Sequence, residues 1–123
     1  MLARKHILVV DDDEPTARML ARYLEAYVVS VAYDGLEALE MARRALPDLV
    51  LTDVWMPRMD GIQLVAAMKA DPQLHRIPVV FLTAVADAPH IAQAISAGAK
   101  HFLRKPISTE KLLHLVEHDM GLG

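Results

Sequence analysis

The chain has 123 residues, of which 54% are hydrophobic and 24% are charged, and its formal net charge at pH 7 is -3. This length suits one domain spanning residues 1–123, and the absence of cysteine excludes disulfide bonds. Without a basic stripe, the domain is not expected to bind nucleic acid directly. The apolar run behind Lys5 is four residues long, too short for a signal peptide or a membrane span, so we expect a cytoplasmic protein without a membrane segment.

Strand-like apolar runs alternate with helical patterns along the chain. Strands are expected at residues 6–11, 28–32, 49–53, 79–83 and 101–104, mostly as continuous aliphatic runs of the kind that parallel sheets bury on both faces. Helices are expected at 15–26, after Asp34, from Gly61 to the residue before Asp71, at 89–97 and at 108–119. Strict alternation predicts right-handed crossovers and a parallel sheet with helices on both faces.

Residues suited to helix ends mark several of these boundaries. Pro15 suits the first turn of the first helix. Asp34 with Glu37 three residues later has the spacing of a capping box, although Asp replaces the usual Ser or Thr. Gly98 favours the left-handed conformation that closes a helix, here the fourth.

A run of four acids, from Asp11 to Glu14, directly follows the first apolar run. Crowded carboxylates at the end of a buried strand are unfavourable, because they repel one another and lose hydration. The run is therefore a candidate cation site. The alternative is that these acids start a helix, where negative charge favours the positive end of the helix dipole.

Polar side chains also occur where the other strands end. Asp53 ends the third strand, Thr83 ends the fourth, and Lys105 follows the fifth. Parallel sheets bind ligands outside the carboxyl ends of their strands, so these three should meet Asp11 and Asp12 at one edge. Carboxylates suit a hard divalent cation, and the hydroxyl and ammonium groups suit a phosphoryl group.

Several motifs, taken together, resemble the receiver domains of two-component response regulators. They are I-L-V-V-D-D-D-E-P at 7–15, D-L-V-L-T-D at 48–53, M-P at 56–57, M-D-G at 59–61, V-F-L-T-A at 80–84 and K-P at 105–106. Their order and intervals suit the family over essentially the whole chain. The resemblance implies a doubly wound (βα)5 flavodoxin-like α/β fold, a three-layer sandwich around a five-stranded parallel sheet in the order 2-1-3-4-5.

The resemblance also implies which residue reacts and which hold metal. Asp53 would accept a phosphoryl group from a sensor histidine kinase or a histidine phosphotransfer protein. Mg²⁺ would be bound by Asp11, Asp12, Asp53 and the backbone carbonyl of Trp55, with Asp11 acting directly or through a metal-bound water. The other two acids of the run would serve the helix start.

The same resemblance assigns the phosphoryl contacts and the output. Thr83, the Ala84 amide and Lys105 would contact the phosphoryl oxygens, and Pro106 would follow Lys105 through a cis peptide bond. Pro106 and Gly61 are otherwise structural residues. When the Thr83 hydroxyl moves onto the phosphoryl group, Phe102 would turn inward and change the face formed by the fourth helix, fifth strand and fifth helix. A downstream protein, a fused output domain or a second copy of the chain could bind that face.

Two features depart from the family pattern. The connection between the first helix and the second strand lacks the usual Gly and is short, so the helix should end early or tightly. Trp55 is bulky, and we hypothesise that its side chain shields the acyl phosphate from water. A Trp55→Ala variant with an unchanged dephosphorylation rate would exclude this role.

Two competing interpretations come from other functional classes. A haloacid-dehalogenase-like phosphatase also uses Mg²⁺ and an Asp nucleophile, with a second acid two residues later, and Asp11 and Asp13 have that spacing. Such enzymes are usually longer, however, and Asp53 would have no role. A receiver that serves only as a non-phosphorylated scaffold would not need the complete set of five site residues. We therefore expect a signalling domain rather than a metabolic enzyme.

One further motif resembles a zinc-protease signature. His114 and His118 belong to an H-x-x-E-H pattern and would share one face of the last helix. No later segment supplies a third ligand or a substrate cleft. We interpret the pattern as a solvent-exposed helix face.

Overall fold

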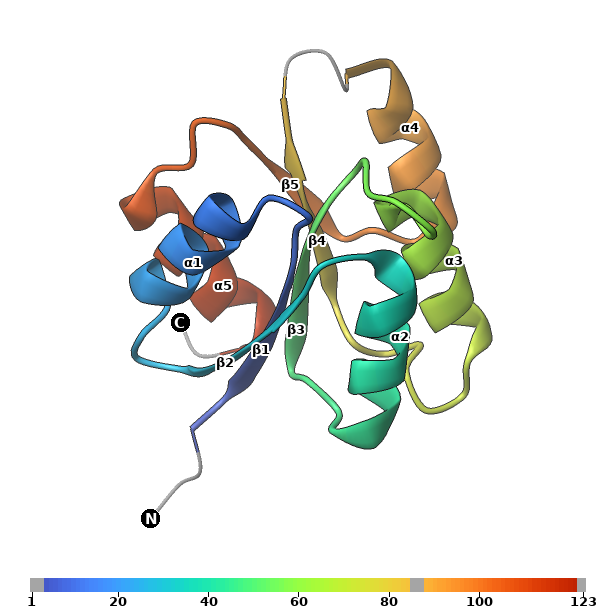
Figure 1. Cartoon of the computed structure of the whole chain (residues 1–123), viewed down its shortest axis with the longest axis horizontal. Coiled ribbons are helices and arrows are strands. Elements are labelled where there is room, and N and C mark those ends of the chain that lie inside the picture. The colour runs from blue at the N-terminus through green and yellow to red at the C-terminus, as the bar shows by residue number, and fades with distance from the viewer. Residues whose placement is uncertain (1–3, 85–87, 122–123) are drawn as a thin grey trace.

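The computed structural model describes residues 4–84 and 88–121, in which strands and helices alternate (Figure 1). The strands are β1 (His6–Val10), β2 (Val28–Ala32), β3 (Leu49–Asp53), β4 (Val79–Thr83) and β5 (His101–Arg104). The helices are α1 (Glu14–Tyr23), α2 (Gly35–Arg44), α3 (Gly61–Ala70), α4 (Ala88–Ala97) and α5 (Thr109–Asp119). None of the helices in the described ranges is long and apolar enough to cross a membrane.

All neighbouring strands are parallel, and their order is β2-β1-β3-β4-β5. Helices α1 and α5 cover one face of the sheet, and α2, α3 and α4 cover the other (Figure 1). The doubly wound three-layer fold and its strand order, implied by the resemblance, are therefore confirmed. The carboxyl ends of all five strands lie at the same edge, because all five run in the same direction.

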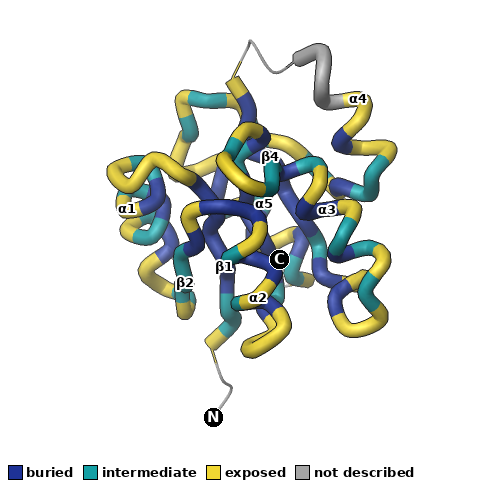
Figure 2. Tube along the Cα trace, turned by 45° about the vertical axis from the view of Figure 1, so that its right-hand side comes forward, coloured by how far each residue is buried: buried dark blue, intermediate teal, exposed yellow. Residues whose placement is uncertain are grey.

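A separate hydrophobic layer fills each side of the sheet. The central strands β1, β3 and β4 are almost wholly buried between the two layers, whereas the edge strands β2 and β5 are partly exposed (Figure 2). Along β1, Leu8 and Val10 face the layer under α2, α3 and α4, while Ile7 and Val9 face the layer under α1 and α5. This alternation follows from the two-residue period of a strand. Burial on both faces explains why the central strands are largely continuous aliphatic runs.

Two predicted boundaries near the first helix shift. β1 ends at Val10 rather than Asp11, although the Asp11 amide still donates to the Ala32 carbonyl at 3.1 Å. Helix α1 ends at Tyr23, earlier than the predicted residue 26, and Leu24 is its fully buried cap. Leu24 ends the helix with a φ of -102°, outside the left-handed region, so no glycine is needed here, which fits the expected early end of this helix.

The structure confirms Asp34 as a helix cap but has the reciprocal capping box at a different helix from the predicted one. Asp34 caps α2 by accepting from the Glu37 amide at 2.8 Å, but the Glu37 carboxylate accepts from Tyr33, one residue before the cap. A reciprocal capping box occurs instead at α3, where Asp60 and Gln63 exchange hydrogen bonds of 2.8 and 3.0 Å. The sequence interpretation missed this capping box.

The last two helices also follow their sequence signals closely. Gly98 comes after α4 with a φ of 117°, a left-handed conformation that favours glycine, as predicted. Helix α5 begins at Thr109 rather than at the predicted Ser108. The Ser108 side chain is the cap and accepts from the Lys111 amide at 3.3 Å.

Candidate functional site

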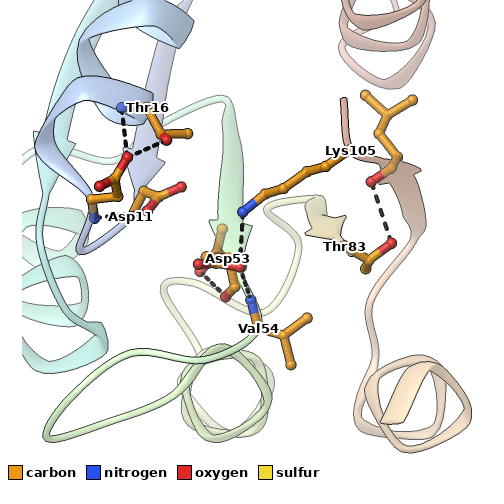
Figure 3. Close-up of polar contacts among 9 residues, drawn as sticks. Asp11, Thr16, Asp53, Val54, Thr83 and Lys105 are labelled. Carbon is orange, nitrogen blue, oxygen red and sulfur yellow. Dashed lines mark hydrogen bonds and ion pairs between the residues drawn. The ribbon is translucent and has the colours of Figure 1, made fainter. Parts of the chain in front are cut away.

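The predicted side chains meet at the carboxyl edge of the sheet. Asp11 follows β1, Asp53 ends β3, Thr83 ends β4, and Lys105 follows β5. Figure 3 shows Lys105 extending towards Asp53, whereas the Thr83 hydroxyl turns the other way. Parallel pairing of the four strands brings together residues that are up to 94 positions apart in the chain (105 minus 11).

Three carboxylates form the acidic part of the site. Asp11, Asp12 and Asp53 each offer one oxygen, and these oxygens lie within 4.8 Å of one another. Asp11 is buried, Asp12 is exposed and Asp53 is partly buried. In the part of the chain that the structure describes, no other group of His, Cys, Asp and Glu brings three potential ligands so close together.

Asp11 is the most constrained of these acids. Its Oδ1 accepts from the Asp13 amide at 2.9 Å, while its buried Oδ2 has no hydrogen-bond partner. Burial raises the pKa of Asp11 to about 6, and the nearby Asp53 carboxylate adds to the rise, whereas the Asp13 amide opposes it. An unpaired buried carboxylate oxygen is unfavourable unless a cation or a proton joins it.

The donor set fits a hard divalent cation. Mg²⁺ and Ca²⁺ take oxygen ligands, and the three carboxylates supply them from two strand ends. A cation there would also satisfy Oδ2 of Asp11 and relieve the repulsion among the acids.

Asp53 is held between the acidic group and a lysine. Its Oδ1 accepts from the Val54 amide at 2.9 Å and lies 3.5 Å from Nζ of Lys105. Burial raises the pKa of Asp53, while Lys105 and the Val54 amide act in the opposite direction. The Lys105 amide donates to the Thr83 carbonyl at 2.7 Å, which fixes the start of the lysine side chain against β4.

The remaining two acids of the run belong to helix α1. The Asp13 carboxylate caps the helix by accepting from the Thr16 amide at 3.1 Å and from the Thr16 hydroxyl. These bonds lower the pKa of Asp13. Glu14 pairs with Arg18 along the exposed helix surface. The expectation that these two acids serve the helix start agrees with these contacts, and the assignment of Asp11 and Asp12 to a cation stays a prediction.

Thr83 and Phe102 adjoin the same small cavity. The Thr83 side chain is buried, and its hydroxyl donates to the Leu103 carbonyl of β5 at 3.4 Å rather than to a group of the acidic site. The cavity holds about 10 Å³ and is lined by Thr83, Phe102 and Ile95, among others. Phe102 is 40% exposed, so in this structure its ring is turned at least partly outwards.

The other predicted residues also lie around the carboxyl edge. The bond between Lys105 and Pro106 is cis, as the resemblance implied. Trp55 is 49% exposed, and Ala84 is exposed directly after β4. Gly61 lies so close to β3 that a Cβ atom would sit 2.2 Å from the Asp53 carbonyl oxygen, which only glycine can tolerate.

Sequence reasoning missed one ion pair beside the site. Arg58 Nε and Nη2 donate to Oδ2 of Asp34 at 2.9 and 2.7 Å, and thereby join the β3–α3 loop to the start of α2. Arg58 has a φ of 65°, which is uncommon outside glycine. Asp34 had been interpreted only as a helix cap. No local pattern links it to an arginine 24 residues away.

His114 and His118 lie on α5 and are exposed, as the sequence indicated. They take no part in the acidic site.

Comparisons with family models and with known proteins agree on one protein family. A family model described as the response regulator receiver domain matches residues 7–117. Response regulator PleD of Caulobacter vibrioides is 48% identical over 103 residues, which make up 82% of this chain and 23% of PleD, so the chain spans less than a quarter of that relative.

Solved structures agree with that match. Chemotaxis protein CheY4 of Vibrio cholerae has a TM-score of 0.88 and 32% identity, over 94% of this chain and 98% of that chain. The receiver domain of sensor histidine kinase PA1611 of Pseudomonas aeruginosa, which has a magnesium ion in its active site cleft, has a TM-score of 0.89 and 27% identity, over 97% of this chain and 99% of that chain.

Proposed function

The chain belongs to the response regulator receiver domain family, and on that premise we propose that Asp53 accepts a phosphoryl group from a phosphohistidine. The donor would be a sensor histidine kinase or a histidine phosphotransfer protein. The observation that carries this proposal is the position of the Asp53 carboxylate, which lies between two acids and the ammonium of Lys105. Residues 1–123 would form one receiver domain.

The proposed reaction moves one phosphoryl group between two side chains. A carboxylate oxygen of Asp53 attacks the phosphorus atom, and the bond from phosphorus to the donor's imidazole nitrogen breaks. The imidazole leaves with the bonding electrons and is protonated by solvent, while Asp53 becomes an acyl phosphate. Asp53 must be ionised to attack, and the charge of Lys105 favours that form against the effect of burial.

We propose that Asp11, Asp12, Asp53 and the Trp55 carbonyl hold Mg²⁺. When bound, the ion would neutralise charge on the phosphoryl oxygens. The unpaired buried oxygen of Asp11 and the close grouping of the three carboxylates support this assignment. The magnesium ion in the PA1611 receiver domain, a structural relative, supports it as well.

Lys105, Thr83 and the Ala84 amide are proposed to bind the phosphoryl oxygens of the product. For this, the Thr83 hydroxyl would leave the Leu103 carbonyl, to which it donates over a long 3.4 Å bond. The space that it vacates adjoins the cavity beside Phe102. We propose that Phe102 then turns inwards and changes the surface of α4, β5 and α5, to which a downstream protein, an output domain or a second copy of the chain binds.

A small phosphodonor tests the acceptor directly. The protein is incubated with Mg²⁺ and acetyl phosphate, and the adduct is located by intact mass and peptide mapping. We expect one phosphoryl group, on the peptide that contains Asp53, and its loss in Asp53→Asn. Asp60→Asn is the matched control, because Asn also caps helices and α3 is preserved. An adduct that survives Asp53→Asn, or no adduct at all, would overturn the proposal.

A phosphatase of the haloacid-dehalogenase type is not favoured. Its second acid would be Asp13, but this carboxylate is engaged as the cap of α1. Its nucleophile would be Asp11, whose Oδ1 is held by the Asp13 amide. Steady turnover of acetyl phosphate that depends on Asp11 and not on Asp53 would be the signature of such an enzyme.

A further inference from the structure

A second polar cluster, formed by Lys100, His101, His118 and Asp119, joins the start of β5 to the end of α5. The Asp119 side chain is fully buried although it is the last residue of its helix, where the helix dipole disfavours an anion. Its Oδ2 contacts Nδ1 of His101 at 2.8 Å. Its Oδ1 has no hydrogen-bond partner and lies 3.9 Å from Nζ of Lys100.

The contact with Asp119 determines which ring nitrogen of His101 carries a hydrogen in that bond. An ionised carboxylate can only accept hydrogen bonds, so Nδ1 of His101 carries the hydrogen in that bond. In the neutral ring, Nε2 then offers a lone pair. The His101 side chain is 41% exposed, so solutes can reach the ring. A histidine whose one nitrogen donates to a carboxylate is the usual form of a metal-ligating histidine.

A second imidazole stands beside the first. The ring centres of His101 and His118 are 6.4 Å apart, with their planes inclined at 59°. Two imidazoles that share one tetrahedral Zn²⁺ have ring centres about 5 to 5.5 Å apart, because each zinc–nitrogen bond is about 2.0–2.1 Å, so the two rings would have to approach each other by about 1 Å. His118 is exposed, so a small side-chain rotation is sterically easy. His114 lies four residues earlier, on the same face of α5.

We propose that His101 and His118 bind a divalent transition ion of the Zn²⁺ class, with Asp119 orienting His101. Imidazole ligands favour such ions over Mg²⁺, so this site and the acidic site select different metals. An ion on Nε2 of His101 also places positive charge beside the buried Asp119 carboxylate. His114 or water completes the coordination, because the two rings alone leave positions open. The bound ion would link β5 to the last turn of α5.

The test is a Zn²⁺ titration of the untagged chain with Mg²⁺ in excess to occupy the acidic site. Calorimetry gives the affinity, and imidazole NMR signals identify the ligands. We expect one Zn²⁺ per chain, shifts of the His101 and His118 signals, and a higher melting temperature with Zn²⁺. Asp119→Asn should weaken binding by about tenfold or more, as is typical when the carboxylate behind a ligating histidine is lost.

The decisive variant is His118→Ala, because this exposed side chain can be removed without disturbing the core. It should lower the Zn²⁺ affinity by at least about tenfold and abolish the thermal shift. His75→Ala removes an exposed histidine elsewhere and is the matched control, with unchanged binding. Equal Zn²⁺ affinity in His118→Ala and the unmodified chain would overturn the proposal. A titration in which neither imidazole signal moves would also overturn the proposal. The cluster would then be an ion pair without a role in metal binding.

Discussion

Nζ of Lys105 lies 3.5 Å from Oδ1 of Asp53. A tight charge-assisted hydrogen bond between these groups would be about 2.7–2.9 Å long. The lysine is therefore close enough to lower the pKa of Asp53, yet its ammonium group is not committed to one oxygen. Such a position suits the proposed contact of Lys105 with a phosphoryl group on the same carboxylate.

Replacing this lysine should slow the acceptor reaction. We expect Lys105→Met to reduce the rate of phosphorylation by acetyl phosphate by about tenfold or more, because one preorganised positive group is lost. Lys105 lowers the pKa of Asp53, so its removal raises that pKa and shifts the pH profile of the reaction to higher pH. Rates are measured by intact mass over time.

Lys111→Met is the control for this substitution, since Lys111 is an exposed lysine at the start of α5. An unchanged rate and pH profile in Lys105→Met would exclude a role for its charge.

Asp11 should make the metal-free protein less stable at neutral pH. Its pKa is about 6 in the folded state and 3.8 in the reference state, so the folded chain binds a proton more tightly between these values. The contribution of Asp11 to the free energy of unfolding therefore falls as pH rises through this window. Asp11→Asn should raise the free energy of unfolding at pH 7.5 in EDTA by about 1 to 3 kcal/mol.

Chemical denaturation at pH 4 and pH 7.5 checks this expectation, and the gain from Asp11→Asn should shrink at the lower pH. Mg²⁺ should stabilise the unmodified chain by mass action and the variant much less. A variant that is less stable than the unmodified chain in EDTA at pH 7.5 would contradict the assignment of an unfavourable buried charge to Asp11.

The parallel pairing of the strands and the burial of the central strands explain which parts of the fold and of the site the sequence could predict. The ranges of β3 and β4 followed from aliphatic runs, because a strand buried on both faces leaves little choice of residue. The meeting of Asp53 and Lys105 at one edge followed from parallel topology. Rotamers and long-range ion pairs lie outside such reasoning. The direction of the Thr83 hydroxyl and the pairing of Arg58 with Asp34 depend on side-chain packing across elements.

The hydroxyl of Thr83 should matter more for switching than for folding. Thr83→Val keeps the shape of the side chain and loses only the long bond to Leu103, so the acceptor reaction should continue at a reduced rate. The phosphorylated variant should lack the change at Phe102, because no hydroxyl moves onto the phosphoryl group. NMR of the Phe102 ring before and after phosphorylation measures this directly. An identical change of the ring in Thr83→Val would rule out the proposed coupling.

The ion pair between Arg58 and Asp34 should tune the metal site through the loop after β3. Hydrogen bonds from the Glu37 amide and Arg58 hold the pKa of Asp34 below its usual range although burial opposes them, so the pair is charged at neutral pH. Arg58→Ala would free one anchor of the segment that contains Trp55, whose carbonyl is a proposed Mg²⁺ ligand. We expect Mg²⁺ affinity to fall by about twofold to fivefold, because one partly exposed ion pair contributes up to about 1 kcal/mol.

Trp55 is the single tryptophan of the chain, so its fluorescence can follow Mg²⁺ binding without a label. Arg44→Ala is the matched control, because its 3.8 Å pair with Glu40 is exposed at the far end of α2 and has no link to the loop. Equal Mg²⁺ affinity in Arg58→Ala and Arg44→Ala would show that the loop keeps its shape without the ion pair. If Mg²⁺ affinity falls only in Arg58→Ala, the Asp34 carboxylate has two roles: it caps α2, and through Arg58 it supports the loop proposed to bind the metal.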